Sequence, residues 1–414
     1  MDTENQSRST RWALTSLGLA MLLSSLGTSI ANVGLPALAQ AFSATFQEVQ
    51  WVVIAYLVAI ATLVVGAGRL GDRYGRRRVL LAGIALFTVA SALCAVAPTL
   101  GSLVAARFAQ GAGAAVIMAL TMAFVGDVVT KARTGRAMGL LGTLSALGTA
   151  LGPTLGGVLI AGPGWQGLFL VNVPLGVIAF VLARRFLPAD RRSEPLGSAR
   201  LMRAGMLRDP ALGAGLAMSA LVTTVMMGTL VVGPFYLSRA LGLDAVSVGL
   251  AMSAGPFAAA LTGLVAGRIV DRFGASSALI GGLAGMAAAS LALATLASAH
   301  GVAGYIAPML VLTIGYSLFQ TANNTAVMVD VRREERGLVS GLLSLARNLG
   351  LIAGASVMGA VFAFGSGTPD VAAAPAAAVG AGMQAAFAVA TLLVGAALAL
   401  SLAVRRESAP AYAN

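Results

Sequence analysis

Long apolar runs separated by short polar gaps dominate this sequence. A helix needs about 20 apolar residues to cross the hydrocarbon core of a bilayer. Twelve runs are long enough, and they lie near residues 13–35, 51–70, 78–97, 101–126, 137–160, 166–187, 211–236, 247–267, 277–298, 302–328, 338–363 and 380–403. Because lipid offers no hydrogen-bond partners to an open backbone, apolar runs of this length predict transmembrane helices. The sequence therefore predicts an all-α membrane protein with 12 transmembrane helices.

The composition excludes an ordinary soluble globule. Only 10% of the 414 residues are charged and 58% are hydrophobic, whereas a soluble domain carries roughly 25% charged residues. Too few polar side chains are present to cover a globular surface. The 51 glycines suit a membrane bundle, in which small residues let helix backbones approach closely.

The basic residues follow a topological pattern. All Lys and Arg residues except Arg107, Arg239 and Arg347 lie at the termini or in alternate gaps between the apolar runs. The positive-inside rule therefore places both termini and these gaps in the cytoplasm of a bacterial inner membrane. The net charge of +12 is explained by this pattern, and we expect no nucleic-acid partner. The polar segment Met1–Arg11 leads into the first span, and no clear cleavage site for a signal peptide follows it.

The chain contains an internal repeat. Gly68–Gly75 after the second span and Gly267–Gly274 after the eighth share the pattern G-R-x-x-D-R-aromatic-G. The longest charged gap lies between these repeats, at the midpoint of the chain. Duplicated halves are common in secondary transporters. We therefore predict an N-terminal six-helix bundle over 1–187, a cytoplasmic linker over 188–210 and a second, pseudo-symmetric bundle over 211–414.

Several motifs carry a family resemblance. The loop G-R-L-G-D-R-Y-G-R-R-R over 68–78 resembles the signature between spans 2 and 3 of the major facilitator superfamily. Leu103–Ala115, Leu147–Leu159 and Gly27–Pro36 resemble motifs of its drug:proton antiporter (multidrug efflux) branch. Together with fits in the second half at Gly315–Met328 and Leu345–Gly350, the resemblance covers essentially the whole chain in a 12-span form.

The resemblance implies a secondary active exporter. It implies alternating access between two six-helix bundles, with small amphipathic molecules such as drugs or metabolites as substrates. No cofactor is expected, since the proton gradient is the implied energy source. The expected partners are the small-molecule substrate, protons and the lipid bilayer, and the expected oligomeric state is a monomer.

The span-2–3 loop and its repeat predict a cytoplasmic gate. Asp72 can lie near the positive end of a neighbouring helix, and the arginines can bridge to acids at helix ends. The predicted gating residues are Asp72, Arg73, Arg76, Asp127, Asp271, Arg272 and Asp330. An ordinary positive-inside loop with solvated acids is the alternative.

The span-5 motif predicts a hinge. Its glycines allow close helix packing, and a proline inside a helix removes one backbone donor. The hinge residues that the resemblance implies are Gly148, Gly152, Pro153, Gly156 and Gly157. Generic glycine packing is the alternative.

Polar side chains inside the spans are candidates for substrate binding or coupling. An arginine in hydrocarbon is costly and by default faces a cavity or a partner. The resemblance places Arg107 in the central cavity, with a part in proton coupling, whereas Arg347 could instead bond helix carbonyls or extend to the interface. The full candidate set is Arg107, Asn32, Tyr56, Gln110, Gln320, Asn323, Asn324 and Arg347. For each uncharged residue of this set, satisfaction of a neighbouring helix is an equal alternative.

One expected group is missing. Multidrug antiporters of this branch commonly carry an acid in span 1, where this chain has Gly27. No carboxylate lies in the middle of any span. Glu48, just before span 2, is the nearest candidate if it enters a periplasmic vestibule, and an exposed loop acid is the favoured alternative. A proton-coupled exporter of cations needs a membrane carboxylate that exchanges a proton for substrate. The absence favours an anionic or neutral substrate, and a facilitator or symporter for an organic anion is the alternative function.

Other classes find little support. A membrane enzyme would have one histidine, His300 in an expected periplasmic loop, one cysteine, Cys94, and no buried pair of acids, so neither catalysis nor a metal site is expected. The chain has no G-x-x-x-x-G-K-[ST] loop, which argues against direct use of ATP. A sensor would need an extramembrane domain large enough to signal, which this sequence does not show and which a partner would have to supply.

Overall fold

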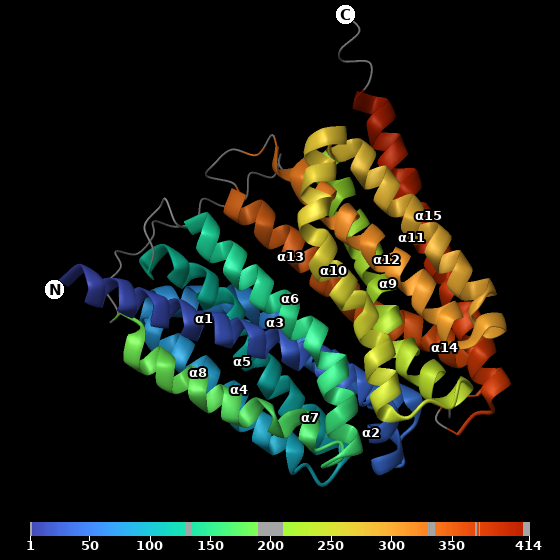
Figure 1. The fold of residues 1–414 in the computed structure, drawn as a ribbon, viewed down its shortest axis with the longest axis horizontal. Coiled ribbons are helices and arrows are strands. Elements are labelled where there is room, and N and C mark those ends of the chain that lie inside the picture. The colour runs from blue at the N-terminus through green and yellow to red at the C-terminus, as the bar shows by residue number, and fades with distance from the viewer. Residues whose placement is uncertain are drawn as a thin grey trace, which may run out of the picture. The chain divides into compact units, whose positions relative to one another are not determined.

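A computed structural model describes residues 2–128, 134–188, 210–329, 331, 336–368, 371 and 373–408 (Figure 1). Within these ranges, 12 helices are long and apolar enough to cross a membrane. The predicted fold class is therefore confirmed.

Eight helices carry the spans of the first half of the chain. They are α1 (Asp2–Val33), α2 (Leu35–Ala41), α3 (Phe46–Tyr74), α4 (Arg76–Ala95), α5 (Leu100–Val128), α6 (Thr134–Ala161), α7 (Gly167–Leu170) and α8 (Asn172–Phe186). The short α2 follows α1 directly and lies beyond the first span, which ends at Val33. Helices α7 and α8 together form the span Gly167–Phe186.

The second half carries the remaining spans. Its elements are α9 (Pro210–Phe235) with the π-helix η3 (Tyr236–Ala240), α10 (Ala245–Phe273), α11 (Ala275–Thr295), α12 (Ala297–Met328), α13 (Arg336–Ala353) with the π-helix η4 (Gly354–Met358), α14 (Gly359–Gly365) and α15 (Ala376–Ser408).

The two copies of the repeated motif form matching turns. Gly75, between α3 and α4, has φ 98°, and Gly274, between α10 and α11, has φ 81°. Side chains disfavour this region of backbone space, so glycine at the last position of each repeat permits the helix to stop and the next to begin at once. The sequence repeat is thus also a repeat of local structure.

Side-chain caps define other helix starts. Asp244 precedes α10 and accepts a hydrogen bond from the backbone N–H of Ser247 at 2.8 Å. The bonds from Ser247 lower the pKa of the Asp244 carboxyl. This arrangement satisfies a donor that the first turn of a helix leaves free.

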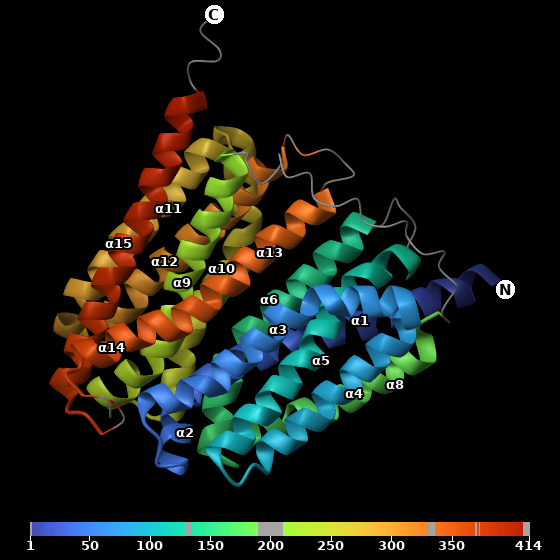
Figure 2. The ribbon, with the colours of Figure 1, turned by 180° about the vertical axis from the view of Figure 1, so that it is seen from behind.

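By its contacts the chain divides into two compact units. The first contains Met1–Ala44 and Trp51–Ala199, and the second contains Thr45–Gln50 and Arg200–Asn414. In the first unit α1 runs beside α6 and α4 beside α5; in the second, α11 packs against α12 and α15 (Figures 1 and 2).

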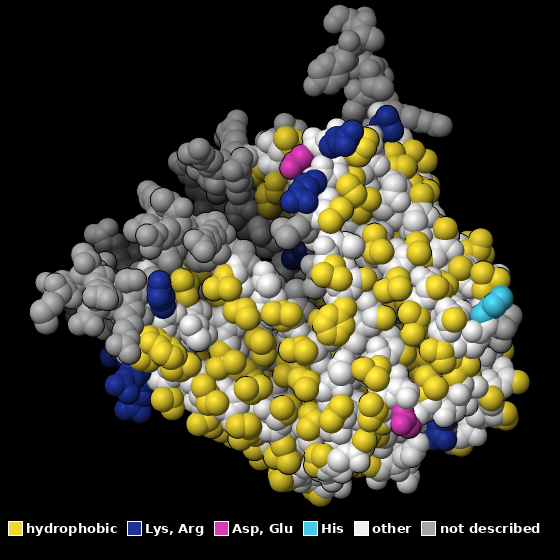
Figure 3. Space-filling view, viewed as in Figure 1, with side chains coloured by type: hydrophobic (Ala, Val, Ile, Leu, Met, Phe, Trp, Pro, Cys, Tyr) yellow, Lys and Arg dark blue, Asp and Glu magenta, His cyan; other side chains and the backbone are white. Residues whose placement is uncertain are grey.

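The outward surface of the bundles is apolar. Hydrophobic side chains cover much of the face in Figure 3, while the described Lys and Arg side chains are few, and most of them lie toward its edges. Large apolar side chains such as Leu261 (77% exposed), Leu392 (73%) and Phe364 (88%) point outward. Such a surface suits lipid as the surrounding solvent.

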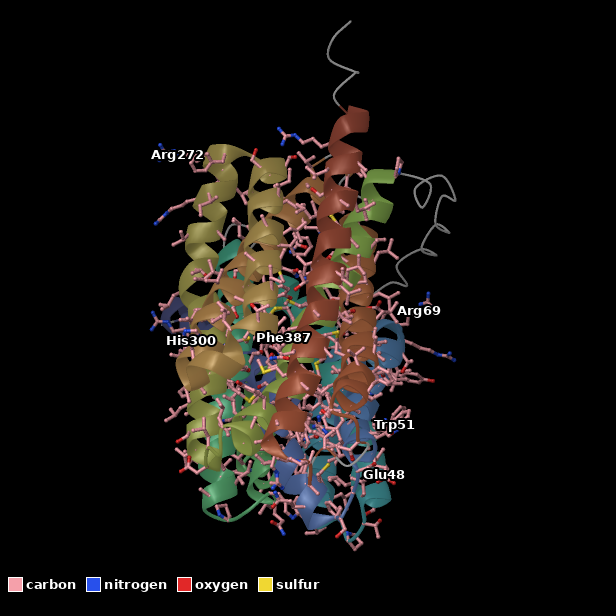
Figure 4. All side chains as sticks on the ribbon, turned by 90° about the vertical axis from the view of Figure 1, so that its right-hand side faces the viewer. Glu48, Trp51, Arg69, Arg272, His300 and Phe387 are labelled. Carbon is pink, nitrogen blue, oxygen red and sulfur yellow. The ribbon has the colours of Figure 1, made fainter. Side chains whose placement is uncertain are left out.

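The single histidine differs from its predicted setting. His300 lies in the first turn of α12, where its Nδ1 is 3.2 Å from the carbonyl oxygen of Leu296, and not in a loop. The next residue, Gly301, has φ 54° and interrupts the helical backbone, which explains why the sequence suggested a loop. Figure 4 shows His300 and Arg272 toward opposite ends of α11.

Candidate functional site

Arg107 of α5 is completely buried inside the first unit. Its Nε donates to the carbonyl oxygen of Val52 on α3 at 2.8 Å. One terminal nitrogen donates to the carbonyl oxygen of Gly27 on α1 at 3.1 Å and to Oε1 of Gln110 at 2.6 Å. The cation is therefore held by backbone and amide oxygens from three helices, and it has no exposed surface on a cavity wall.

Aromatic rings complete this enclosure. The guanidinium carbon of Arg107 lies 4.2 Å from the ring centroid of Tyr56 and 5.8 Å from that of Phe169. A cation over an aromatic face gains electrostatic energy, and the gain is larger where water is excluded. The rings help to hold a charge that has no carboxylate beside it among the described side chains.

Glycines allow the helices to come close enough for these bonds. A Cβ atom at Gly111 would lie 2.4 Å from the backbone oxygen of Tyr56, so α5 touches α3 directly. A Cβ atom at Gly27 would lie 3.1 Å from the Tyr56 hydroxyl and 3.1 Å from the ring of Phe87. At the position of the missing span-1 acid, the chain thus offers Arg107 a bare backbone carbonyl in a tightly filled space.

One part of Arg107 remains without a partner. The second terminal nitrogen is buried and makes no hydrogen bond with the protein. A guanidinium stays protonated at any physiological pH, so Arg107 cannot itself release a proton. What it can do is hold an anion, a carboxylate or a polar substrate group through those free N–H bonds.

The other predicted polar residues of the first unit bond to neighbouring helix atoms. The Tyr56 hydroxyl donates to the carbonyl oxygen of Ser24 at 2.8 Å, and the Gln110 amide donates to the hydroxyl of Ser91 at 2.7 Å. The Asn32 amide donates within its own helix to the carbonyl oxygen of Thr28 at 3.0 Å, while its Oδ1 has no partner. Tyr56, Gln110 and Arg107 form one buried group, and Asn32 lies further along α1.

The predicted polar residues of the second unit do not form one group. Asn323 is buried and donates to the carbonyl oxygen of Gly215 at 3.1 Å and to the hydroxyl of Ser219 at 3.0 Å. Gln320 is half-buried, with an Oε1 atom that has no partner. Asn324 is half-buried on α12. Arg347 on α13 is also half-buried and lies within electrostatic range of Tyr316.

The glycines of the span-5 motif form the contact between α6 and α1. Added Cβ atoms at Gly148, Gly152 and Gly156 would lie 2.6 Å from the Leu22 carbonyl oxygen, 1.9 Å from the Ser29 hydroxyl and 2.3 Å from Val33, respectively. Hydroxyls join the same contact, with the Oγ atoms of Ser25 and Ser145 2.6 Å apart. Pro153 and Gly157 are buried, and α6 continues through Pro153. The motif therefore fixes how closely these two helices pack.

The second unit contains a matching contact that sequence reasoning did not single out. The Thr224 hydroxyl on α9 donates to the Gly350 carbonyl oxygen on α13 at 3.1 Å, as the Ser29 hydroxyl donates to the Gly148 carbonyl oxygen at 3.4 Å in the first unit. A Cβ atom at Gly354 would lie 2.4 Å from the Thr224 carbonyl oxygen. The G-x-x-x-G spacing of Gly350 and Gly354 was the available signal.

The predicted gate is partly described. Asp72 is exposed and forms an ion pair with Arg76, the first residue of α4, at 3.1 Å. Arg77 donates to the carbonyl oxygen of Arg184.

The other predicted gating residues are exposed or lie outside the residues that the structure describes. Arg73 lies over the ring of its neighbour Tyr74, and Arg272 over that of Phe273, at 5.4 Å in both cases. Asp271 is exposed. The side chain of Asp127 and the whole of Asp330 lie outside the described residues, so their predicted pairings remain predictions.

We expect Asp72→Asn to slow turnover several-fold without abolishing substrate binding. The substitution removes the charge that pairs with Arg76 at the turn between α3 and α4, but it leaves the buried residues unchanged. Transport rate and substrate Kd, measured on the same purified protein, test this expectation. Asp271→Asn makes the same change in the second copy of the motif, where no ion pair is described, so we expect a smaller effect there. Unchanged rates in both variants would show that the repeated loops serve topology alone.

Glu48 acts as a helix cap. Its Oε2 accepts from the backbone N–H of Thr45 at 2.8 Å and from the Thr45 hydroxyl at 2.9 Å, and the Thr45 hydroxyl accepts from the Glu48 N–H at 3.3 Å. These reciprocal bonds form a capping box at the start of α3. The carboxylate is exposed at one end of α3, with Arg69 toward the other (Figure 4).

We expect Glu48→Gln to retain full coupled transport. Glutamine also serves at this position of a capping box, but it cannot carry a proton. Proton flux per substrate molecule in proteoliposomes is the measurement. A lost proton flux with intact substrate binding would identify Glu48 as the proton carrier instead.

Twelve spans in two repeated halves, with buried polar groups and no extramembrane domain among the described residues, define a polytopic transporter. The family model "Major Facilitator Superfamily" matches residues 17–355, and the chain belongs to that family.

Individual relatives agree with this assignment. The chain is 31% identical to the uncharacterized transporter YebQ of Escherichia coli K12, over 83% of this chain and 86% of that protein. It is 29% identical to the multidrug resistance protein Stp of Mycobacterium tuberculosis, over 84% of this chain and 75% of that protein. A bacterial homologue of the human lysosomal transporter Spinster has the same fold, with a TM-score of 0.78 at 16% identity, covering 96% and 97% of the two chains.

Proposed function

We propose that this transporter exports small amphipathic molecules across the bacterial inner membrane by alternating access, driven by the proton gradient. The observation that carries the proposal is the contact between α6 and α1. The antiporter-like motif presents Gly148, Gly152 and Gly156 directly to α1, with added Cβ atoms at 1.9–2.6 Å from it. The name of the relative Stp, a multidrug resistance protein, supports the same reading.

The proposed cycle assigns separate roles to the residues. The α1–α6 contact and its counterpart between α9 and α13 act as the points about which helices tilt. The Asp72–Arg76 pair stabilises one state of the predicted cytoplasmic gate. Arg107 supplies a fixed positive charge. The unpartnered terminal nitrogen of its guanidinium donates hydrogen bonds to an acceptor in one state of the cycle. A ligand can shift the two states only through its different affinity for them.

The direction of transport is the first test. Cells that lack their major efflux systems would express this chain or an empty vector, and be loaded with fluorescent amphipathic dyes of positive, zero and negative charge. We expect lower steady-state accumulation of at least one dye, and loss of that difference on collapse of the proton gradient. Higher accumulation in expressing cells would contradict export.

A second function, uptake of an organic anion by a facilitator or symporter, has an observation of its own. The free N–H bonds of Arg107 lie in spans without a central carboxylate. This arrangement suits a substrate that brings its own negative charge. Accumulation of the anionic dye alone, abolished by Arg107→Leu, would favour this function over export.

A further inference from the structure

A separate cavity of about 450 Å³ lies wholly within the second unit. It is bounded by the first turns of α9 and α11 and by the last turns of α12 and α15. These four helix ends all lie on the side that the positive-inside rule places in the cytoplasm. The volume is in the range of sites for small molecules.

The walls of the cavity have two distinct parts. Apolar side chains, among them Met218, Leu279 and Val327, form most of its lining. The polar lining is limited to Ser276, Asn323, Ser401 and Arg405, each within about two turns of the predicted cytoplasmic end of its helix. A ligand that matches both parts has an apolar body and a polar group at the level of the cytoplasmic interface.

The side-chain oxygen of Asn323 has no hydrogen-bond donor in the structure. The residue is 1% exposed, and both of its described hydrogen bonds use its Nδ2. Its Oδ1 has no partner and lies beside Gly215, which also lines the cavity and has no side chain to cover it. Buried polar atoms are satisfied in the great majority of cases, so this acceptor indicates a missing donor.

Among the residues that the structure describes, Arg405 provides the one charged side chain of the lining. It is exposed and lies one turn from the end of α15. Figure 3 shows Lys and Arg side chains, with an acidic side chain beside them, at the upper end of this unit in that view. Basic pockets between transmembrane helices on the cytoplasmic side favour anionic headgroups.

We propose that this cavity binds an anionic amphiphile that carries a hydroxyl group. Its anion lies against Arg405, its hydroxyl donates to Oδ1 of Asn323, and its apolar body packs among the ends of α9, α11, α12 and α15. A phospholipid of the cytoplasmic leaflet or a free amphiphile of the cytoplasm would supply this chemistry. The site belongs to one unit alone and does not depend on the direction or energy source of transport.

Native mass spectrometry of the full-length, delipidated protein tests the proposal. The probes are phosphatidylglycerol, which is anionic and carries hydroxyls, and phosphatidylethanolamine with the same acyl chains. We expect phosphatidylglycerol to be retained preferentially, and Arg405→Gln to weaken its binding about fivefold. Arg268→Gln is the matched control, because Arg268 is an exposed arginine at the same end of the unit that does not line the cavity.

A filled cavity provides the second test. Ala326 is exposed and lines the cavity, so Ala326→Phe should fold and occupy the space of the ligand. We expect it to lower binding about tenfold or more, while Ala403→Phe, at an exposed alanine outside the lining, leaves binding unchanged. Unaltered binding in Ala326→Phe, together with equal retention of the two lipids, would overturn the proposal.

Calorimetry with 3-hydroxydodecanoate distinguishes a free amphiphile of the cytoplasm from a membrane phospholipid as the ligand of the cavity. Binding that is blocked by Ala326→Phe, without selective retention of phosphatidylglycerol, would assign the cavity to a free amphiphile. Selective retention of phosphatidylglycerol that Ala326→Phe lowers, without binding of 3-hydroxydodecanoate, would assign the cavity to a membrane lipid, whereas selective retention that Ala326→Phe leaves unchanged would overturn the proposal. If neither probe binds, the cavity is not a site for this class of ligand.

Discussion

Arg107→Leu is expected to lower transport about a hundredfold or more while the protein still folds. Leucine removes a buried cation that bonds to oxygens of α1, α3 and α5. The carbonyls of Val52 and Gly27 belong to helices and retain their own helical environment, so few polar groups lose all their partners. A hydrogen bond made by a charged group contributes about 1.5–3 kcal/mol. A hundredfold loss of rate corresponds to about 2.7 kcal/mol, so the loss of one such bond from the transition state would produce it. Transport per folded protein, with folding measured by size-exclusion chromatography, checks the expectation.

Arg107→Lys separates charge from geometry. Lysine keeps a positive charge but lacks the planar fork that bonds to several oxygens at once. We expect a partial loss of transport, smaller than that of Arg107→Leu. Full transport by Arg107→Leu at normal expression would show that the buried cation has no part in the cycle.

Gly152→Ala is expected to reduce transport roughly tenfold, and Ser29→Gly in the same chain to restore much of it. The added Cβ would lie 1.9 Å from Oγ and 2.8 Å from Cβ of Ser29, so α1 and α6 must separate. Overpacking of this kind costs about 1–3 kcal/mol. Removing the Ser29 side chain makes room for the added Cβ at position 152. A glycine within α1 costs about 1 kcal/mol of helix stability, so the rescue is incomplete.

Gly148→Ala is the matched control for that rescue. Its nearest obstacle is the backbone carbonyl oxygen of Leu22 at 2.6 Å, which no side-chain substitution removes. We therefore expect Ser29→Gly to rescue Gly152→Ala but not Gly148→Ala, with transport measured per folded protein. Normal transport by both single variants would mean that close α1–α6 packing is not required for the cycle.

The membrane architecture was readable from the sequence because it depends on long apolar runs. The predicted spans overlap all 12 described ones, and the fold class needed no tertiary information. The repeated motif ends at Gly75 and Gly274, and the structure has a turn with positive φ at both residues. Bounds were less accurate near Gly301, where a local backbone break resembles a loop in sequence but lies within α12.

The hydrogen-bond partners of the polar side chains could not be predicted from the sequence. The sequence marked Arg107 as costly in a membrane, but its acceptors are backbone oxygens of Val52 and Gly27, which no side-chain pattern reports. The sequence showed Glu48 as an acid just before span 2, but only the structure shows its capping bonds to Thr45. The cavity beside Asn323 arises from four helix ends that are distant in sequence.

Substrate-driven proton movement in proteoliposomes tests the central claim most directly. Purified protein would be reconstituted with a pH-sensitive dye inside, and challenged with cationic, neutral and anionic amphipathic compounds. The proposal predicts that at least one compound drives proton movement opposite to its own, and that Arg107→Leu abolishes the signal. Transport of a compound without any proton movement, or with protons moving in the same direction, would contradict a proton-driven exporter.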